Sequence, residues 1–162
     1  MFLDSIVKQL DQNFADEFCR LRIALFTELG ELSSDSDYTE LNAATKQYYL
    51  SHIKKDLMSW GIFDNENLVA IGSLCLFSRI PYQENLTGSE GYILNIYTIP
   101  SHRKLGYAKR ILDEIIRYSR ENHINRLWLN ASEQGREVYK KLGFQEKDNE
   151  MELFLPHTSL ND

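Results

Sequence analysis

The amino-acid sequence predicts a mixed α/β fold in a single domain spanning residues 1–162. Residues 14–29 and 105–122 place apolar side chains every three or four positions, which indicates amphipathic helices. Residues 92–99, YILNIYTI, are β-branched, aromatic and almost continuously apolar, which is typical of a central strand buried on both faces. A strand, a helix and a further strand at 126–130 imply a parallel pair with a right-handed crossover, whereas the hairpins imply antiparallel neighbours.

Element boundaries are marked by changes in hydrophobic period and by turn residues. Pro81, Pro100 and Pro156 each lie where an element is expected to end, and Gly143 follows the last expected helix. In order, we expect a strand at 5–10, a helix at 14–29, a loop at 33–40, a helix at 40–58, strands at 60–64 and 68–77 joined by a turn at 64–67, a loop at 78–90, a strand at 92–99, a helix at 105–122, a strand at 126–130, a helix at 133–142, and a closing hairpin of 144–147 and 151–155.

Composition and charge exclude several classes of protein. A net charge of -6 disfavours a general nucleic-acid binder, which needs a basic face. No apolar run approaches the roughly 20 residues that cross a bilayer, and the first residues do not read as a secretory signal, so we expect no membrane association and a cytoplasmic location. Cys19 and Cys75 are expected to be buried, reduced thiols, and the four histidines lack metal-ligand spacing, so no metal site is expected.

The join between the strand at 92–99 and the helix at 105–122 has the character of an anion site. Residues 102–110, HRKLGYAKR, hold four Lys and Arg residues and no acid, which suggests a small local anion rather than a polymer. The first amides of a helix lack intrahelical partners, so a phosphate can accept hydrogen bonds from several of them. Gly106 permits close backbone approach, and Arg103 and Lys104 add charge. The alternative is that Gly106 only eases the turn from strand to helix.

The spacing Arg103-x-x-Gly106-x-Ala108 resembles the R/Q-x-x-G-x-G/A signature of the GNAT superfamily of N-acetyltransferases. The preceding NIYTIPSHRKLGYA is similar to that superfamily's strand-loop-helix segment, and the resemblance covers roughly residues 60–155. It implies a GNAT-like mixed sheet, splayed at its centre and flanked by helices, with acetyl-CoA as cosubstrate. It also implies that the CoA pyrophosphate is held by the backbone amides of Arg103, Lys104, Leu105, Gly106, Tyr107 and Ala108.

A second motif lies at residues 130–144, NASEQGREVYKKLGF. Ser132 suits a helix N-cap, and Ser132, Gly135 and Tyr139 share one helix face by their spacing. A glycine in the first turn costs about 1 kcal/mol against alanine, which suggests that something approaches this face closely. Taken alone, Tyr139 reads more readily as an ordinary core residue than as a functional one, since the chain has nine tyrosines.

The ending V-Y-K-K-L-G-F resembles the l-Y-e-k-l-G-F ending of the same superfamily, which implies that Tyr139 protonates the departing CoA thiolate. The chemistry suits a phenol with a pKa of about 10, which is neutral at pH 7 and can still donate a proton. Many relatives have an asparagine where this chain has Ser132. Either Ser132 or Asn130 is therefore expected to contact the cofactor, beside Gly135.

The resemblance further implies that the cofactor's pantetheine amides pair with the exposed strand edge formed by Ile96, Tyr97, Thr98 and Ile99. A bulge near Asn95 would help to open the gap between strands, and a backbone N–H near Ile96 or Tyr97 is the candidate for stabilising the oxyanion. The alternative for Asn95 is a hydrogen-bonded core asparagine.

These features predict an enzyme, an N-acetyltransferase that moves an acetyl group directly from acetyl-CoA to an amine of a small molecule or peptide. Neither cysteine has a neighbouring histidine in the sequence, which argues against a covalent acyl-cysteine route. The alternative function is a non-catalytic acyl-CoA-binding sensor, and a homodimer is left open.

The candidate bases are Glu31, Glu84, Glu90 and water, although these glutamates more commonly serve as solvated surface charge. The acidic loop with Asp35, Asp37 and Glu40 hints at a cationic amine, such as a polyamine or a lysine side chain, or is simply solvated.

Overall fold

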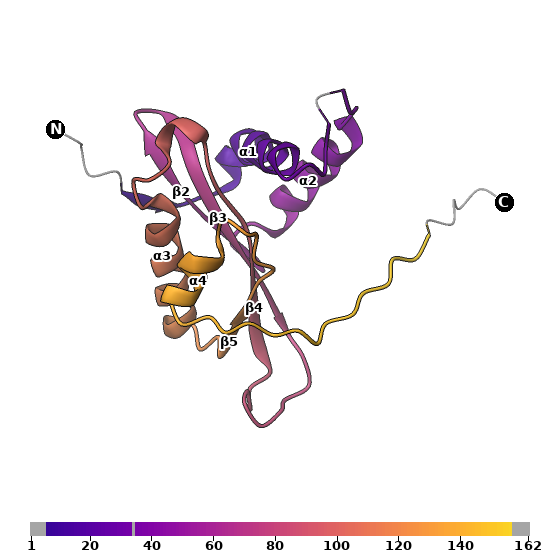
Figure 1. Ribbon diagram of the computed structural model, residues 1–162, viewed down its shortest axis with the longest axis vertical. Coiled ribbons are helices and arrows are strands. Elements are labelled where there is room, and N and C mark those ends of the chain that lie inside the picture. The colour runs from indigo at the N-terminus through magenta and orange to yellow at the C-terminus, as the bar shows by residue number, and fades with distance from the viewer. Residues whose placement is uncertain (1–5, 34, 157–162) are drawn as a thin grey trace. The chain divides into compact units, whose positions relative to one another are not determined.

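The computed structural model describes residues 6–33 and 35–156 (Figure 1). Ser5 and Ser34, which belong to the expected first strand and the expected loop, lie outside the described residues. The elements are β1 (Val7–Gln9), η1 (Gln12–Phe14), α1 (Ala15–Glu28), α2 (Thr39–His52), β2 (Leu57–Asp64), β3 (Asn67–Ser78), β4 (Ser89–Thr98), η2 (Pro100–His102), α3 (Tyr107–Glu121), β5 (Arg126–Trp128) and α4 (Arg136–Lys141).

The strands form one five-stranded sheet in the order β1-β2-β3-β4-β5. Neighbouring strands are antiparallel from β1 to β4, and β4 pairs with β5 in parallel. The parallel pair is joined through α3, as the strand-helix-strand pattern requires. The predicted mixed α/β sheet flanked by helices is therefore confirmed.

Two consecutive residues of β3 show which helices cover which face of the sheet. Ile71 packs in a cluster with Leu21 of α1, whereas a Cβ on Gly72 would meet Ile111 and Ile115 of α3. Successive residues of a strand point to opposite faces, so α1 and α3 cover opposite faces of the sheet (Figure 1). The lack of a side chain at Gly72 lets α3 approach the sheet closely.

The two N-terminal helices pack on each other through a buried cluster. Phe18 of α1 and Tyr49 of α2 have ring centroids 4.5 Å apart, and Tyr49 is fully buried. The Tyr49 hydroxyl donates to the carbonyl of Asp11 at 2.7 Å, so its polar end is satisfied despite the burial. This contact ties α2 to the chain that leads out of β1.

The helix expected at 40–58 is shorter than predicted. The structure ends α2 at His52, Lys54 takes a left-handed φ of 62°, and β2 begins at Leu57. Residues 57 and 58 are buried and pair with β3, so sheet pairing outweighs a helical spacing that continued to Met58. The other expected helices and strands up to α4 are found, with ends shifted by a few residues.

The expected closing hairpin is wrong. Residues 144–147 and 151–155 form no strand in the described chain, and apolar side chains in the second segment are exposed, Met151 by 96%. A hairpin with strands of four or five residues is marginal unless a further strand or a helix packs against it. Apolar alternation alone therefore did not suffice to predict strand pairing here.

By its internal contacts the chain divides into two compact units, Met1–Asn130 and Ala131–Asp162. The first unit holds the sheet and helices α1 to α3, and the second holds α4. The single domain over residues 1–162 stays a prediction. Within the described ranges, no helix has the length and apolarity that crossing a bilayer requires.

Candidate functional site

Strand β4 has two halves that differ in pairing. Residues 89–92, here called the paired half, include the three residues from Glu90 to Tyr92 that pair with β5 as well as with β3. Residues 93–98, the one-sided half, pair with β3 only, among the residues that the structure describes. Strands β4 and β5 thus separate after Tyr92, which is the splay that the resemblance implies. The one-sided half contains Ile96, Tyr97 and Thr98, three of the predicted pantetheine contacts.

The predicted bulge lies at Asn95. Register with β3 shifts between Ile71, opposite Tyr97, and Ser73, opposite Leu94, so Asn95 and Ile96 together face Gly72. Asn95 has a left-handed φ of 60°, a region that asparagine tolerates better than most residues. The side chain is 5% exposed and neither its oxygen nor its nitrogen has a hydrogen-bond partner. The alternative of a hydrogen-bonded core asparagine is therefore wrong, although Asn95 is buried.

The loop after β4 leads into α3 through two left-handed residues. Lys104 has a φ of 63°, and Gly106, at the N-cap of α3, has a φ of 78°. The first helical bond runs from the amide of Arg110 to the carbonyl of Gly106, so the amides of the preceding turn have no intrahelical acceptor. No acidic residue lies in this first turn, and Lys104, Leu105 and Gly106 are exposed. The geometry suits an anion. A Cβ on Gly106 would meet no atom within 4 Å, so glycine is required there for its left-handed φ and not for lack of space.

Arg103 has a different position from the one that the motif suggests. Its guanidinium donates to Glu28 of α1 at 2.5 Å and to the carbonyl of Thr98 at 3.0 Å. The hydrogen bond from Arg103, opposed by burial, lowers the pKa of Glu28. Arg103 thus fastens the loop to α1, which sequence reasoning missed because the two partners are 75 residues apart. Its contact with the pyrophosphate stays a prediction.

The paired half is held by a buried carboxylate. Glu90 is fully buried and accepts hydrogen bonds from Arg79, from Tyr82 at 3.0 Å and from Arg126 at 2.7 Å. Burial alone would raise the pKa of Glu90, but the hydrogen bonds from Arg126, Tyr82 and Arg79 outweigh it and lower the pKa. The expected role as solvated surface charge is wrong for Glu90. A carboxylate whose charged form is stabilised in this way is a poor base. Glu90 instead links β4 to β5 and to the loop at residues 79–88.

The two cysteines are free thiols, Cys19 buried and Cys75 partly buried. Burial is the main cause that raises the pKa of each thiol. Thiols of raised pKa are weak nucleophiles, which agrees with the expectation that no acyl-cysteine forms. Among the described residues, no three His, Cys, Asp or Glu side chains are grouped to hold a metal ion.

Asn130, at the end of the first unit, donates its side-chain amide to the Tyr92 hydroxyl at 3.2 Å. Tyr92 in turn packs on Trp128 of β5, with ring centroids 4.4 Å apart. Asn130 therefore lies beside the point where β4 and β5 separate. From that point the chain runs through the other predicted cofactor contacts of the first unit, Ile96 to Ala108, and into α3.

In the second unit, Ser132, Gly135 and Tyr139 come together. The Ser132 hydroxyl accepts from the Gly135 amide at 3.2 Å and so caps the turn that leads into α4. A Cβ on Gly135 would lie 2.8 Å from the Tyr139 ring and 3.3 Å from the Ser132 hydroxyl. The group that approaches the Gly135 face closely is thus the ring of Tyr139.

The end of α4 fixes that tyrosine. Gly143 has a φ of 99°, its amide bonds to the carbonyl of Lys140, and the amide of Phe144 bonds to the carbonyl of Tyr139, which is a complete Schellman motif. The Phe144 ring packs edge-on against Tyr139, with centroids 5.9 Å apart. Burial raises the pKa of Tyr139, so its hydroxyl keeps its proton at neutral pH. The V-Y-K-K-L-G-F motif therefore builds a fixed, protonated phenol.

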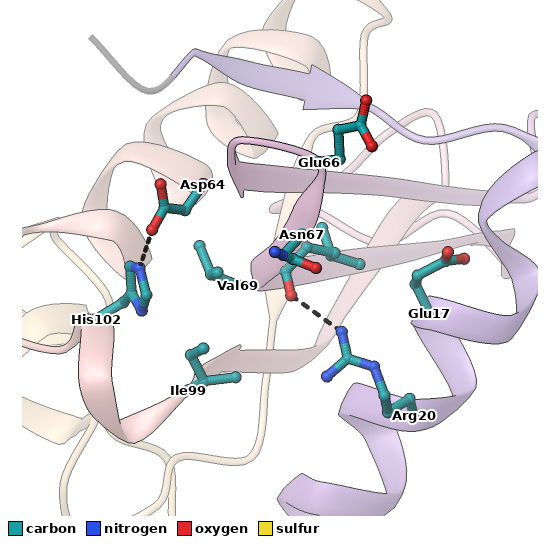
Figure 2. A pocket seen from close by; sticks show the side chains of 9 residues that line it. Glu17, Arg20, Asp64, Glu66, Asn67, Val69, Ile99 and His102 are labelled. Carbon is teal, nitrogen blue, oxygen red and sulfur yellow. Dashed lines mark hydrogen bonds and ion pairs between the residues drawn. The ribbon is translucent and has the colours of Figure 1, made fainter. Parts of the chain in front are cut away.

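A cavity of ≈ 440 Å³ lies beside the start of β3 and the end of β4. Figure 2 shows the side chains that line it. Its polar groups satisfy one another in part: Arg20 donates to the carbonyl of Leu68 at 3.2 Å, and His102 Nε2 lies 2.8 Å from Asp64. One lining residue, Ile99, belongs to the predicted pantetheine contacts. The cavity is lined by Glu17, Arg20, Asp64, Glu66, Asn67, Leu68, Val69, Ile99 and His102.

Comparison with known proteins identifies the family. The family model described as the acetyltransferase (GNAT) family matches residues 17–144. A protein of Clostridium acetobutylicum described as a predicted acetyltransferase, solved with acetyl-CoA, is 28% identical with a TM-score of 0.83, over 92% of this chain and 95% of that one. A GCN5-related N-acetyltransferase of Ralstonia eutropha is 24% identical with a TM-score of 0.78, over 93% of this chain and 97% of that one. A search of curated proteins finds no match.

The chain belongs to the GNAT family of acetyltransferases. This membership confirms the predicted family, and with it the predicted class of enzyme, an acyltransferase. The roles of the individual site residues stay predictions.

Proposed function

We propose that this protein transfers an acetyl group directly from acetyl-CoA to an amine of a small molecule or a peptide. Acetyl-CoA is the cosubstrate, in keeping with the family and with the acetyl-CoA held by the Clostridium acetobutylicum relative. The observation that carries the proposal is the one-sided half of β4, which runs directly into the left-handed loop and the open N-terminus of α3.

Each part of the cosubstrate has a matching group on this path. The pantetheine amides pair with residues 96–99, which are the end of β4 and Ile99 directly after it, as an extra strand would. The pyrophosphate accepts from the amides of residues 103–108, with Lys104 adding a cation. The thioester then lies toward the bulge at Asn95, where a backbone N–H near Ile96 or Tyr97 stabilises the oxyanion.

The reaction is an addition followed by an elimination. The lone pair of a neutral amine attacks the thioester carbonyl, the C–S bond breaks, and the Tyr139 hydroxyl passes its proton to the leaving sulfur. The proton lost by the amine goes to water or to a base. Glu31 and Glu84 remain candidates for that base, since both are exposed. The weak nucleophilicity of the two thiols supports the direct route.

The structural neighbours act on different acceptors, so they do not define the acceptor of this chain. One, AAC(6')-Iy, was solved with a bisubstrate analogue of CoA and acetylneamine at 16% identity, and another is a ribosomal-protein-alanine N-acetyltransferase at 18% identity. The two free thiols fit a reducing compartment, which supports the proposed cytoplasmic location. The homodimer stays a prediction.

The test is a turnover screen with acetyl-CoA across amines, aminoglycosides, amino acids and peptides, reading released thiol. In the active reaction, we expect Tyr139→Phe to lower kcat by roughly 100-fold or more, the scale of a lost general acid, with little change in the Kd of acetyl-CoA. Tyr118→Phe is the matched control, because Tyr118 lies on α3 and packs against Trp60.

An unchanged kcat in Tyr139→Phe would show that Tyr139 is not the general acid that protonates the leaving sulfur. Thermal stabilisation by acetyl-CoA without turnover on any acceptor would favour the sensor instead.

A further inference from the structure

Arg22 lies on the face of α1 that packs into the protein. Phe18 and Cys19, four and three residues earlier, are buried in the cluster between α1 and α2, and Arg22 continues that face. Its guanidinium lies 4.5 Å from the ring centroid of Phe26, one turn later. Arg22 is itself partly buried. A cation on this face therefore requires an explanation.

Other arginines of the described chain hold carboxylates or carbonyls. Arg79 and Arg126 hold Glu90, Arg103 holds Glu28, and Arg117 holds Glu114 and Glu121. For Arg22, no ion pair or hydrogen bond of the guanidinium is found within residues 6–33 and 35–156. Burial is the largest cause that lowers the pKa of Arg22. A partly desolvated cation that is not hydrogen-bonded to an anion is costly, and the nearby Glu31 makes no ion pair with it among the described residues, so the site favours a bound anion from outside them.

The sheet register shows what lies opposite Arg22. Cys75 of β3 pairs directly with Tyr92 of β4, so both side chains point to the same face. That face is the one covered by α1 and α2, since Cys75 packs against their cluster. Cys75, Glu31 and Tyr92 all act electrostatically on Arg22. Arg22 thus lies on the same side of the sheet as Cys75 and Tyr92, within electrostatic range of both.

Tyr92 is the last residue of β4 that pairs with β5, and the one-sided half begins at the next residue. If the pantetheine follows that half, its thioester end lies toward Tyr92. An acceptor that reaches the thioester from the α1 side passes the Arg22 guanidinium. On this path Arg22 is near the end of the cosubstrate where the acceptor reacts. The loop that receives the pyrophosphate is at the other end of the one-sided half.

We propose that the acceptor amine carries an anionic group, a carboxylate or a phosphate, and that Arg22 binds this group on the α1 side of the sheet. The inference rests on the proposed function, because it places the acceptor by the path of acetyl-CoA. Arginine suits this task, since its planar fork of donors matches both anions in a bidentate geometry. The polyamine or peptide lysine suggested by the acidic loop then becomes the competing outcome.

The experiment compares matched amines that differ in one anionic group. The pairs are L-phenylalanine with phenethylamine, L-lysine with cadaverine, and glucosamine 6-phosphate with glucosamine, with spermidine as the cationic acceptor. We expect the anionic member of at least one pair to have a kcat/KM higher by about tenfold or more, the scale of one charge-assisted hydrogen bond. The amino-acid pairs and the sugar pair distinguish a carboxylate from a phosphate.

Arg22→Gln supplies the second arm. We expect it to raise the KM of the preferred anionic acceptor by roughly tenfold or more while the neutral member of the pair changes little. Arg22→Lys keeps the charge and recovers part of the preference. Arg120→Gln, on the exposed surface at the end of α3, is the matched control and leaves both members unchanged.

The outcomes separate the two proposals. Absence of transfer to any amine by the wild type contradicts the proposed function itself. Transfer with a preference for spermidine or for the neutral members overturns only the anionic acceptor, as does an Arg22→Gln variant with an unaltered preference. A purely structural Arg22 would instead lower the Tm in Arg22→Gln and reduce turnover on all acceptors alike.

Discussion

The two halves of β4 contrast in what surrounds them. The paired half is hydrogen-bonded to a strand on each side and holds the buried Glu90, which three side chains from elsewhere in the chain bind. The one-sided half has a partner strand on one side, a left-handed bulge at Asn95 and two buried amide atoms without partners. A single strand can therefore be anchored at one end and leave at the other an unpaired edge, where we propose that acetyl-CoA binds.

The largest effect is expected at the anchor. Glu90→Ala should lower the free energy of unfolding by about 3 kcal/mol, the low end for removing one partner of a buried ion pair, because Arg79 and Arg126 still reach water. Urea denaturation measures the change. A loss near zero would mean that the paired half is not anchored by this carboxylate.

The same carboxylate should give a pH-dependent stability. The folded pKa of Glu90 is lowered, so its stabilisation is present above the unfolded pKa of about 4.3 and is lost as the pH falls through the folded value. The difference in unfolding free energy between wild type and Glu90→Gln should thus be constant between about pH 7 and pH 5.5 and shrink below about pH 4. A difference that grows on acidification would contradict the assigned direction.

A smaller effect is expected where the one-sided half meets α3. A Cβ on Gly72 would meet Ile111 and lie 2.7 Å from Ile96, so Gly72→Val should destabilise the protein by about 1–3 kcal/mol through overpacking. Because Ile96 lies in the one-sided half, this variant should also weaken acetyl-CoA binding in calorimetry.

Gly91→Ala is the control in the paired half, where a Cβ would lie 2.6 Å from Leu74 and 2.9 Å from Leu127. It should lower stability and leave the Kd of acetyl-CoA unchanged. Equal losses of affinity in both variants would erase the functional difference between the halves.

The smallest effect is expected at the bulge itself. Asn95→Gly should change stability by less than about 1 kcal/mol, since glycine adopts a φ of 60° freely and the variant removes two unpartnered polar atoms. Asn95→Val should cost more, about 1–2 kcal/mol, because a β-branched residue is strained in the left-handed region. Thermal unfolding of the two variants side by side decides, and an equal loss in both would show that the Asn95 amide itself stabilises the fold.

Much of the donor side could be predicted from the sequence because it is encoded locally. The loop with Gly106 and the ending with Tyr139 and Gly143 each lie within a few residues, and their spacing reflects helix N-terminal and C-terminal geometry. The bulge near Asn95 was implied by the resemblance to the GNAT superfamily, and the register between β3 and β4 shows it.

The sequence by itself determined the order of the elements, the parallel crossover and the two motifs of the family, because hydrophobic period and turn residues act over short stretches of chain. Only the tertiary structure decided that α2 ends at His52, that Glu90 is a buried anchor, that Arg103 binds Glu28, and that Arg22 lies within electrostatic range of Cys75 and Tyr92. Each of these depends on a partner that is distant in sequence, and local pattern carries no information about which distant groups meet when a sheet selects its register.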